Sequence, residues 1–108
     1  MLVPDSSILR VLRLLDASPR LTQREMAREM GISLGKANYC LRALLSRGFV
    51  KVQNFRKSTN KRGYAYLLTP EGVTAKADLT RQFLVRKRDE YDALRLEIER
   101  LQRESENP

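Results

Sequence analysis

The chain has 108 residues, of which 42% are hydrophobic and 31% charged, so it is long enough for one small globular domain with an appendage. One cysteine and no histidine exclude an internal disulfide, a usual zinc site and a histidine-based catalytic triad, so we expect no enzyme activity, metal or cofactor. No apolar run approaches the roughly 20 residues of a membrane span and the N-terminus lacks signal-peptide order, so we expect a cytoplasmic protein without membrane contact.

The positive charge is concentrated in one part of the chain. Residues 1–69 hold thirteen Lys and Arg against four Asp and Glu, a net charge of +9, whereas residues 70–108 hold eight against nine, a net charge of −1. Residues 30–70 contain no acidic side chain. Such a surface suits a polyanion, because binding phosphates releases their counterions. A basic face kept for solubility is the alternative.

A first helix is expected over residues 6–16. Asp5 or Ser6 is a candidate cap, and Ser18-Pro19 ends the pattern. Its apolar residues recur at helical spacing: Ile8, Val11, Leu12 and Leu15.

Two short helices are expected next, joined by a turn at residues 30–33. Thr22 and Glu25 fit a capping box that starts the second helix, and Gly31 suits the left-handed conformation that ends it. Ser33 caps the third helix, whose apolar side is formed by Leu34, Ala37, Leu41, Leu44 and Leu45. Two helices joined in this way form a helix-turn-helix, whose second helix can enter the major groove of DNA.

A basic hairpin, or wing, is expected to follow. Residues 49–55 and 64–68 are rich in Val, Phe and Tyr and predict two strands, with a polar loop at residues 56–63. Four cations surround the loop: Arg56, Lys57, Lys61 and Arg62. Basic hairpins of this kind meet the DNA backbone or the narrow minor groove, where A·T tracts concentrate negative potential.

The exposed side of the third helix has groups that suit DNA recognition. Lys36 and Arg42 can pair with phosphate or guanine, and Asn38 with adenine. Gly35 permits close approach of the backbone, and Tyr39 can meet a phosphate or a thymine methyl. An ordinary solvent-exposed face on a three-helix core is the alternative.

The N-terminus of the second helix offers free amides to one more phosphate. Together these arguments predict one DNA-binding set: Thr22, Gln23, Arg24, Ser33, Gly35, Lys36, Asn38, Tyr39, Arg42, Ser46, Arg56, Lys57, Lys61 and Arg62. Cys40 lies at the edge of the apolar arc of the third helix, which suits a small core residue. An oxidation switch is the second interpretation of this thiol.

Thr69-Pro70-Glu71 predicts the start of a final helix, and no glycine or proline interrupts residues 73–107. Its distal part has a heptad pattern, with Lys87 at a d position and five apolar a and d residues predicted to form a dimer contact: Leu84, Tyr91, Leu94, Ile98 and Leu101.

Glu90 falls at a g position and Arg95 at the following e position, the pairing that joins parallel neighbours, although the sequence leaves parallel and antiparallel pairing open. We expect a homodimer. The alternatives are a solvated helix supported by pairs within it, such as Arg86 with Glu90, or a helix folded back on the rest of the chain.

Two segments resemble the MarR group of winged helix-turn-helix regulators, namely LTQREMAREMGISLGKANYCLRALLSRGFVKVQNF and GYAYLLTPEG. Within them, GISLGKANYCLRAL and YLLTPEG are most similar to the small bacterial MarR-type regulators described as exopolysaccharide-associated. The resemblance implies sequence-specific binding to promoter DNA, a dimer, and regulation of polysaccharide genes.

The resemblance also bears on the wing and on effectors. The Asp-x-Arg element of MarR wings corresponds here to Asn60-Lys61-Arg62, so Arg62 keeps the arginine while the acidic partner is missing. The longer N-terminal and paired C-terminal helices from which larger MarR proteins build a ligand pocket are not recognisable, so we expect no small-molecule effector.

The predicted fold is mainly α with a small β-hairpin: a winged helix-turn-helix head over residues 1–69 and a long C-terminal dimerisation helix over residues 70–108. The predicted function is a transcription regulator that binds an inverted repeat in double-stranded DNA as a dimer. A winged-helix module for protein interaction or RNA binding is the second hypothesis. A membrane-surface role ranks third, because the cations lie across a helix and a hairpin.

Overall fold

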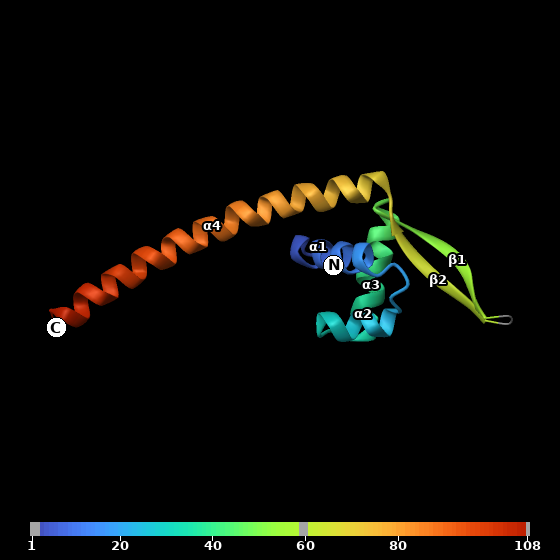
Figure 1. Ribbon diagram of the computed structural model, residues 1–108, viewed down its shortest axis with the longest axis horizontal. Coiled ribbons are helices and arrows are strands. Elements are labelled where there is room, and N and C mark those ends of the chain that lie inside the picture. The colour runs from blue at the N-terminus through green and yellow to red at the C-terminus, as the bar shows by residue number, and fades with distance from the viewer. Residues whose placement is uncertain (1–2, 59–60, 108) are drawn as a thin grey trace. The chain divides into compact units, whose positions relative to one another are not determined.

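The structure, a computed structural model, describes the backbone of residues 3–58 and 61–107 and the side chains of residues 3–54 and 63–107. The described residues form four helices and one two-stranded antiparallel sheet (Figure 1). In chain order these are α1 (Asp5–Ala17), α2 (Gln23–Met30), α3 (Leu34–Ser46), β1 (Val50–Ser58), β2 (Lys61–Leu68) and α4 (Pro70–Glu106). The predicted fold class, mainly α with a small β-hairpin and a long C-terminal helix, is confirmed.

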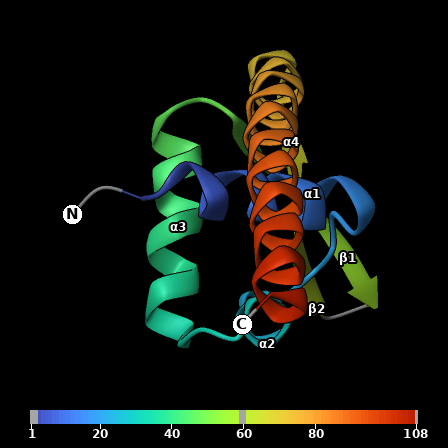
Figure 2. The same cartoon turned by 90° about the vertical axis from the view of Figure 1, so that its left-hand side faces the viewer.

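The chain divides into two compact units, Met1–Asp78 and Leu79–Pro108. In the first unit α1 packs against α2, α3 and β2, and Figures 1 and 2 show it beside both neighbouring helices. The largest fully buried side chains of this unit are Ile8, Val11, Leu12, Leu15, Met26, Leu41 and Leu44. Burying a side chain of this size stabilises the fold by about 1.5–3 kcal/mol, so this core fixes how the three helices meet.

The predicted ends of α2 are confirmed. The Thr22 hydroxyl accepts a hydrogen bond from the Glu25 amide at 3.1 Å, and the Glu25 carboxylate accepts one from the Thr22 amide at 3.3 Å. Gly31 ends the helix with φ 65°, in the left-handed region where a side chain would be strained.

The side chain of Arg10, on α1, donates hydrogen bonds to the C-terminal end of α2. Its Nη2 donates to the Glu29 carbonyl at 2.6 Å and its Nη1 to the Met30 carbonyl at 3.5 Å. These carbonyls have no partner within the helix, so the guanidinium satisfies groups that would otherwise depend on water.

The predicted side-chain cap of α1 is wrong. Pro4 occupies the cap position and no side chain caps the helix. The Pro4 carbonyl accepts hydrogen bonds from the Ser7 and Ile8 amides at 3.0 and 3.1 Å, so the backbone itself starts the helix at Asp5.

The cap of α3 is confirmed, because the Ser33 hydroxyl accepts from the Lys36 amide at 3.1 Å. Leu34 differs from its prediction, since it is 41% exposed instead of lying in the core. Side chains of a helix tilt toward its N-terminus, so a residue in the first turn points past the end of the helix. The buried side of α3 therefore begins at Ala37 and includes Cys40.

The two strands of the wing are longer than predicted. Backbone pairing runs from Val50 with Leu68 to Arg56 with Arg62, and Ser58 pairs with Lys61 after an irregularity in register. The predicted loop over residues 56–63 is thus wrong for most of its length. Cross-strand hydrogen bonds join backbone groups, so a ribbon can continue through residues whose side chains are polar. At the inner edge of the wing, the Tyr66 amide donates to the Pro19 carbonyl at 2.9 Å.

Thr69 joins the wing to α4. The helix begins at Pro70, which confirms its predicted start. Its hydroxyl donates to the Gly48 carbonyl and accepts from the Gly72 amide at 3.0 Å. Gly72 is buried so closely against Phe49 that an added Cβ would lie 1.9 Å from the Phe49 carbonyl oxygen. The first turn of α4 is therefore packed directly on backbone.

Further along α4, but still within the first unit, Lys76 Nζ pairs with the Asp16 carboxylate of α1 at 2.6 Å. The second unit consists of the distal part of α4, whose described residues from Leu84 onward are all exposed. Across residues 3–58 and 61–107, no helix combines the length and the apolar character that a membrane crossing requires.

Candidate nucleic-acid interface

The outward side of α3 forms a continuous surface, which we call the α3 face. Six residues line a shallow hollow of about 540 Å³ on it: Gly35, Asn38, Tyr39, Arg42, Ala43 and Ser46. Tyr39, Arg42 and Ser46 are exposed, and Asn38 is half-buried. The structure thus brings together five residues of the predicted DNA-binding set. Lys36 is also exposed on α3, and Ser33 lies at its cap.

The N-terminus of α2 lies beside this face. Thr22 and Arg24 are exposed, whereas Gln23 is half-buried. The Asn38 amide Nδ2 donates a hydrogen bond to Gln23 Oε1 at 3.0 Å, which joins the start of α2 to α3. Gln23, from the predicted residues at the start of α2, thus contacts Asn38, from those of α3.

A second hollow, of about 230 Å³, connects α2 with the wing. It is lined by Arg20, Leu21, Thr22, Gln23, Gly63, Tyr64 and Tyr66. Arg20 and Tyr64 line this hollow but do not belong to the predicted DNA-binding set. Arg20 contributes to the basic charge of residues 1–69, and Tyr64 is an exposed aromatic residue of a strand, but only the fold places them beside Thr22.

The side chains of the predicted wing cations, Arg56, Lys57, Lys61 and Arg62, lie outside the described residues, as does Asn60. The described backbone pairs Arg56 with Arg62 across the hairpin. Their contact with DNA stays a prediction.

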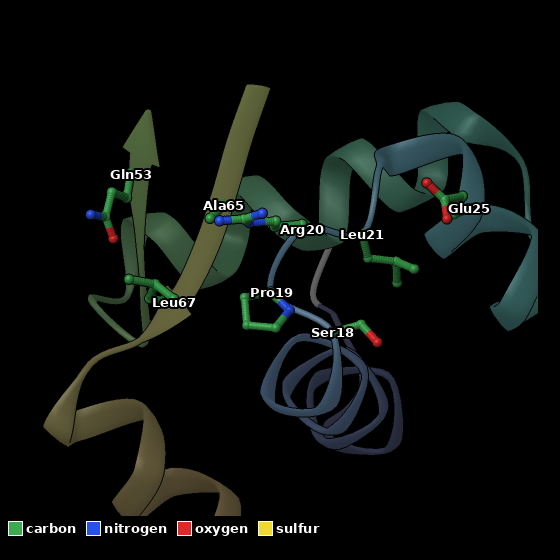
Figure 3. Close-up of a pocket in the computed structure, with 8 residues that line it drawn as sticks. All are labelled: Ser18, Pro19, Arg20, Leu21, Glu25, Gln53, Ala65 and Leu67. Carbon is green, nitrogen blue, oxygen red and sulfur yellow. The ribbon is translucent and has the colours of Figure 1, made fainter. Parts of the chain in front are cut away.

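A third hollow, of about 520 Å³, lies at the inner edge of the wing. Figure 3 shows its side chains coming from the loop after α1, from α2 and from both strands, with Pro19 and Leu21 across from Ala65 and Leu67. Arg20 lines this hollow and the one beside Thr22. None of the predicted DNA-binding residues whose side chains the structure describes lines it.

Cys40 is buried in the core side of α3. Burial raises the pKa of its thiol, because an apolar environment disfavours the thiolate. Since the thiolate is the reactive form, this environment suits a core residue better than an oxidation sensor.

The predicted dimer residues are all exposed on α4: Leu84, Tyr91, Leu94, Ile98 and Leu101. A shallow hollow of about 320 Å³ lies along this side and is lined by Tyr91, Leu94, Arg95, Ile98, Glu99 and Gln102. The pair of Arg86 with Glu90, which belongs to the alternative of a solvated helix, does not form between these two described side chains. Glu90 Oε2 lies 3.2 Å from Lys87 Nζ, and the Arg86 guanidinium lies 4.7 Å from the centre of the Phe83 ring.

Residues 4–51 match the protein family described as winged helix-turn-helix DNA-binding. The match covers 48 of the 108 residues and agrees with the winged helix-turn-helix fold of the structure. No protein of curated function matches the chain.

Solved structures of MarR-family proteins share the fold. A Mycobacterium tuberculosis MarR family protein in complex with salicylic acid is 26% identical, with a TM-score of 0.58 over 82% of this chain and 63% of that one. Staphylococcus aureus MarR in complex with salicylate and kanamycin is 20% identical, with a TM-score of 0.57 over 83% and 57%. A MarR/EmrR family transcriptional regulator from Acinetobacter sp. ADP1 is 16% identical, with a TM-score of 0.60 over 94% and 75%. The chain thus spans less than two thirds of the Mycobacterium and Staphylococcus proteins.

Proposed function

We propose that this DNA-binding domain serves a dimeric transcription regulator of the MarR type, which reads double-stranded DNA by placing the α3 face in the major groove. The observation that supports this most is the gathering of Asn38, Tyr39 and Arg42 around one hollow, within a stretch of chain that has no acidic residue. A helix surface with hydrogen-bonding side chains and positive charge fits the width and the chemistry of the major groove.

The groups of this surface divide into two kinds. Arg42 can bind guanine O6 and N7, and Asn38 adenine N6 and N7, so these two supply base readout. Lys36, the Thr22 end of α2 and the wing supply contacts to phosphates, which set position and orientation without reading sequence.

Replacing Arg42 by alanine tests the base-reading assignment. We expect the variant to lose about 1–3 kcal/mol of binding free energy at the operator and to relax the preference at particular base pairs, while binding to random duplexes changes less. The measurement is the affinity of the purified protein for a duplex obtained by selection, compared with random sequence. Arg47→Ala is the matched control, because Arg47 is exposed at the end of α3 but does not line the hollow. An unchanged motif and affinity in Arg42→Ala would show that α3 lies elsewhere.

The salt dependence of binding affinity tests whether the wing contacts phosphates. Arg62→Ala should weaken binding to every duplex and flatten the log-log dependence of affinity on salt by about 0.9 for each phosphate that the variant no longer neutralises. Arg103→Ala removes the same charge from the last turn of α4 and should leave the slope as it is. If both variants keep the wild-type slope, the wing does not touch phosphates.

We propose that the second copy in the dimer binds along the seam, defined as the a and d positions Leu84, Lys87, Tyr91, Leu94, Ile98 and Leu101. The charges beside the seam favour parallel pairing. Acidic residues occupy the g positions Glu90, Glu97 and Glu104, and basic residues the e positions Arg88 and Arg95. In a parallel pair Glu90 faces Arg95 of the partner subunit, whereas an antiparallel pair would place acid beside acid and base beside base.

A two-fold protein implies an inverted repeat, with half-sites about 10–10.5 base pairs apart. We further propose operators at genes of polysaccharide synthesis, an assignment supported by the resemblance in GISLGKANYCLRAL and YLLTPEG alone. Selection of duplex DNA by the purified protein tests the function as a whole. A palindromic motif is the expected result, and tight RNA binding without an enriched duplex motif would favour the RNA-binding hypothesis instead.

A further inference from the structure

The hydrogen bond between Asn38 and Gln23 has a chemical consequence for base recognition. It joins two half-buried side chains that are fifteen positions apart in sequence, and it is formed between the two helices of the helix-turn-helix. Both helices rest on the same apolar core, through Met26 and Ala27 of α2 and Ala37 and Leu41 of α3. The distance between the two amides is therefore set by packing.

A primary amide has two N–H donors and one carbonyl acceptor. In this pair Asn38 uses one N–H of Nδ2 and keeps the second N–H and Oδ1. One donor and one acceptor on the same amide are what a bidentate contact to adenine N7 and N6 requires. Among the described residues, Gln23 uses only its Oε1 and keeps both donors of Nε2.

The two residues of this pair line different hollows. Asn38 lines the hollow on the α3 face, beside Tyr39 and Arg42. Gln23 lines the hollow at the start of α2, beside Arg20 and Thr22. The bond thus links the hollow on the α3 face, which suits a base, with the hollow at the start of α2, which suits a phosphate.

We propose that Gln23 is a positioning residue: it holds the Asn38 amide in the orientation that presents Oδ1 and the second N–H to an adenine, while its own Nε2 donates to a phosphate. This inference rests on the proposed DNA-binding function. Holding the side chain before DNA arrives removes the entropy cost of fixing it on binding. Gln23 therefore contributes to sequence preference although it touches no base.

The test uses the full-length protein and the duplex motif that it selects, with the adenine base pair assigned to Asn38 replaced by each alternative. The measured quantity is the ratio of affinities between the motif and these replacements. Asn38→Ala should lower the ratio by about 5- to 150-fold. Gln23→Ala should lower it by about 2- to 12-fold, and should have no further effect on the ratio in an Asn38→Ala background.

Gln23→Glu separates positioning from the phosphate contact. A carboxylate still accepts from Asn38, so the ratio should stay near the wild-type value, while the missing donors and the added negative charge weaken binding to every duplex. Arg24→Ala is the control, because it removes an exposed cation from the same turn of α2 and should lower affinity without changing the ratio. Thermal melting of each variant verifies that the first unit is folded.

A wild-type ratio in Gln23→Ala, together with a strongly lowered ratio in Asn38→Ala, would overturn the positioning role and leave the proposed function standing. A wild-type ratio in Asn38→Ala would overturn it as well, because Asn38 would then read no base. If the wild-type protein selects no duplex motif, the proposed function itself fails and this inference with it.

Discussion

Replacing Leu94 and Ile98 together by glutamate is expected to yield folded monomers that have lost most of their operator affinity. Both side chains are exposed in the single chain, at 55% and 47%, so the first unit should keep its stability. In the dimer, the two changes would place like charges against each other on the seam without partners. Loss of tethering removes an advantage of about 10²- to 10⁴-fold, because each domain then binds its half-site alone.

Sedimentation measures the oligomeric state of this variant, and titration of the selected operator measures its affinity. Leu96→Glu is the matched control, since Leu96 is 56% exposed on the same helix but lies at an f position away from the seam. The control should remain dimeric. An intact dimer in the double variant would place the interface elsewhere, and a monomeric wild type would contradict the symmetric arrangement.

Replacing Gly72 by alanine is expected to destabilise the first unit by about 1–3 kcal/mol, although alanine is the better helix former by about 1 kcal/mol. The new Cβ would lie 1.9 Å from the Phe49 carbonyl oxygen and 2.9 Å from the carbonyl carbon. Both are backbone atoms, so no change of rotamer relieves the overlap and α4 must move away from Phe49. Packing therefore outweighs propensity at this position.

The midpoint of chemical denaturation measures the effect. Gly35→Ala provides the control, because an added Cβ there meets only the Ser33 hydroxyl, at 4.0 Å. The control should leave stability unchanged or raise it by up to about 1 kcal/mol, through propensity alone. A gain in stability on changing Gly72 would show that the close approach to Phe49 is absent.

Most features governed by neighbouring residues were predictable from the sequence, the side-chain cap of α1 being the exception. The capping box of Thr22 and Glu25, the left-handed Gly31 and the Ser33 cap all depend on groups within a few positions, and the structure confirms each of them. The start of α4 at Pro70 belongs to the same class. Local hydrogen-bonding chemistry decides such features before the chain folds.

Features governed by tertiary contact were not predictable in this way. The wing extends through Arg56 and Ser58 because the facing strand supplies backbone partners, which side-chain polarity does not report. The contact of Gly72 with Phe49 depends on how the start of α4 packs on the segment between α3 and β1.

The candidate site contains both features that the local sequence predicts and features that depend on tertiary contact. Helical periodicity predicted that Gly35, Tyr39, Arg42 and Ser46 share one side of α3, with Asn38 on its flank. The structure places all five around one hollow. The bond from Asn38 to Gln23 and the approach of Tyr64 to Thr22 join residues far apart in sequence. No periodicity within one helix could indicate them. The contact of these residues with DNA stays a prediction.

The short length of α2 limits how this DNA-reading element could be transplanted. Its eight residues are fewer than the roughly 12–15 at which isolated helices become even marginally stable in water. The helix persists because Thr22 closes its start, Arg10 of α1 satisfies its last carbonyls, and Met26 is fully buried in the shared core. Grafting α2 and α3 onto another scaffold would therefore require α1 as well. Arg10, which holds the end of α2 and the turn before α3 in place, lies on α1, outside the helix-turn-helix.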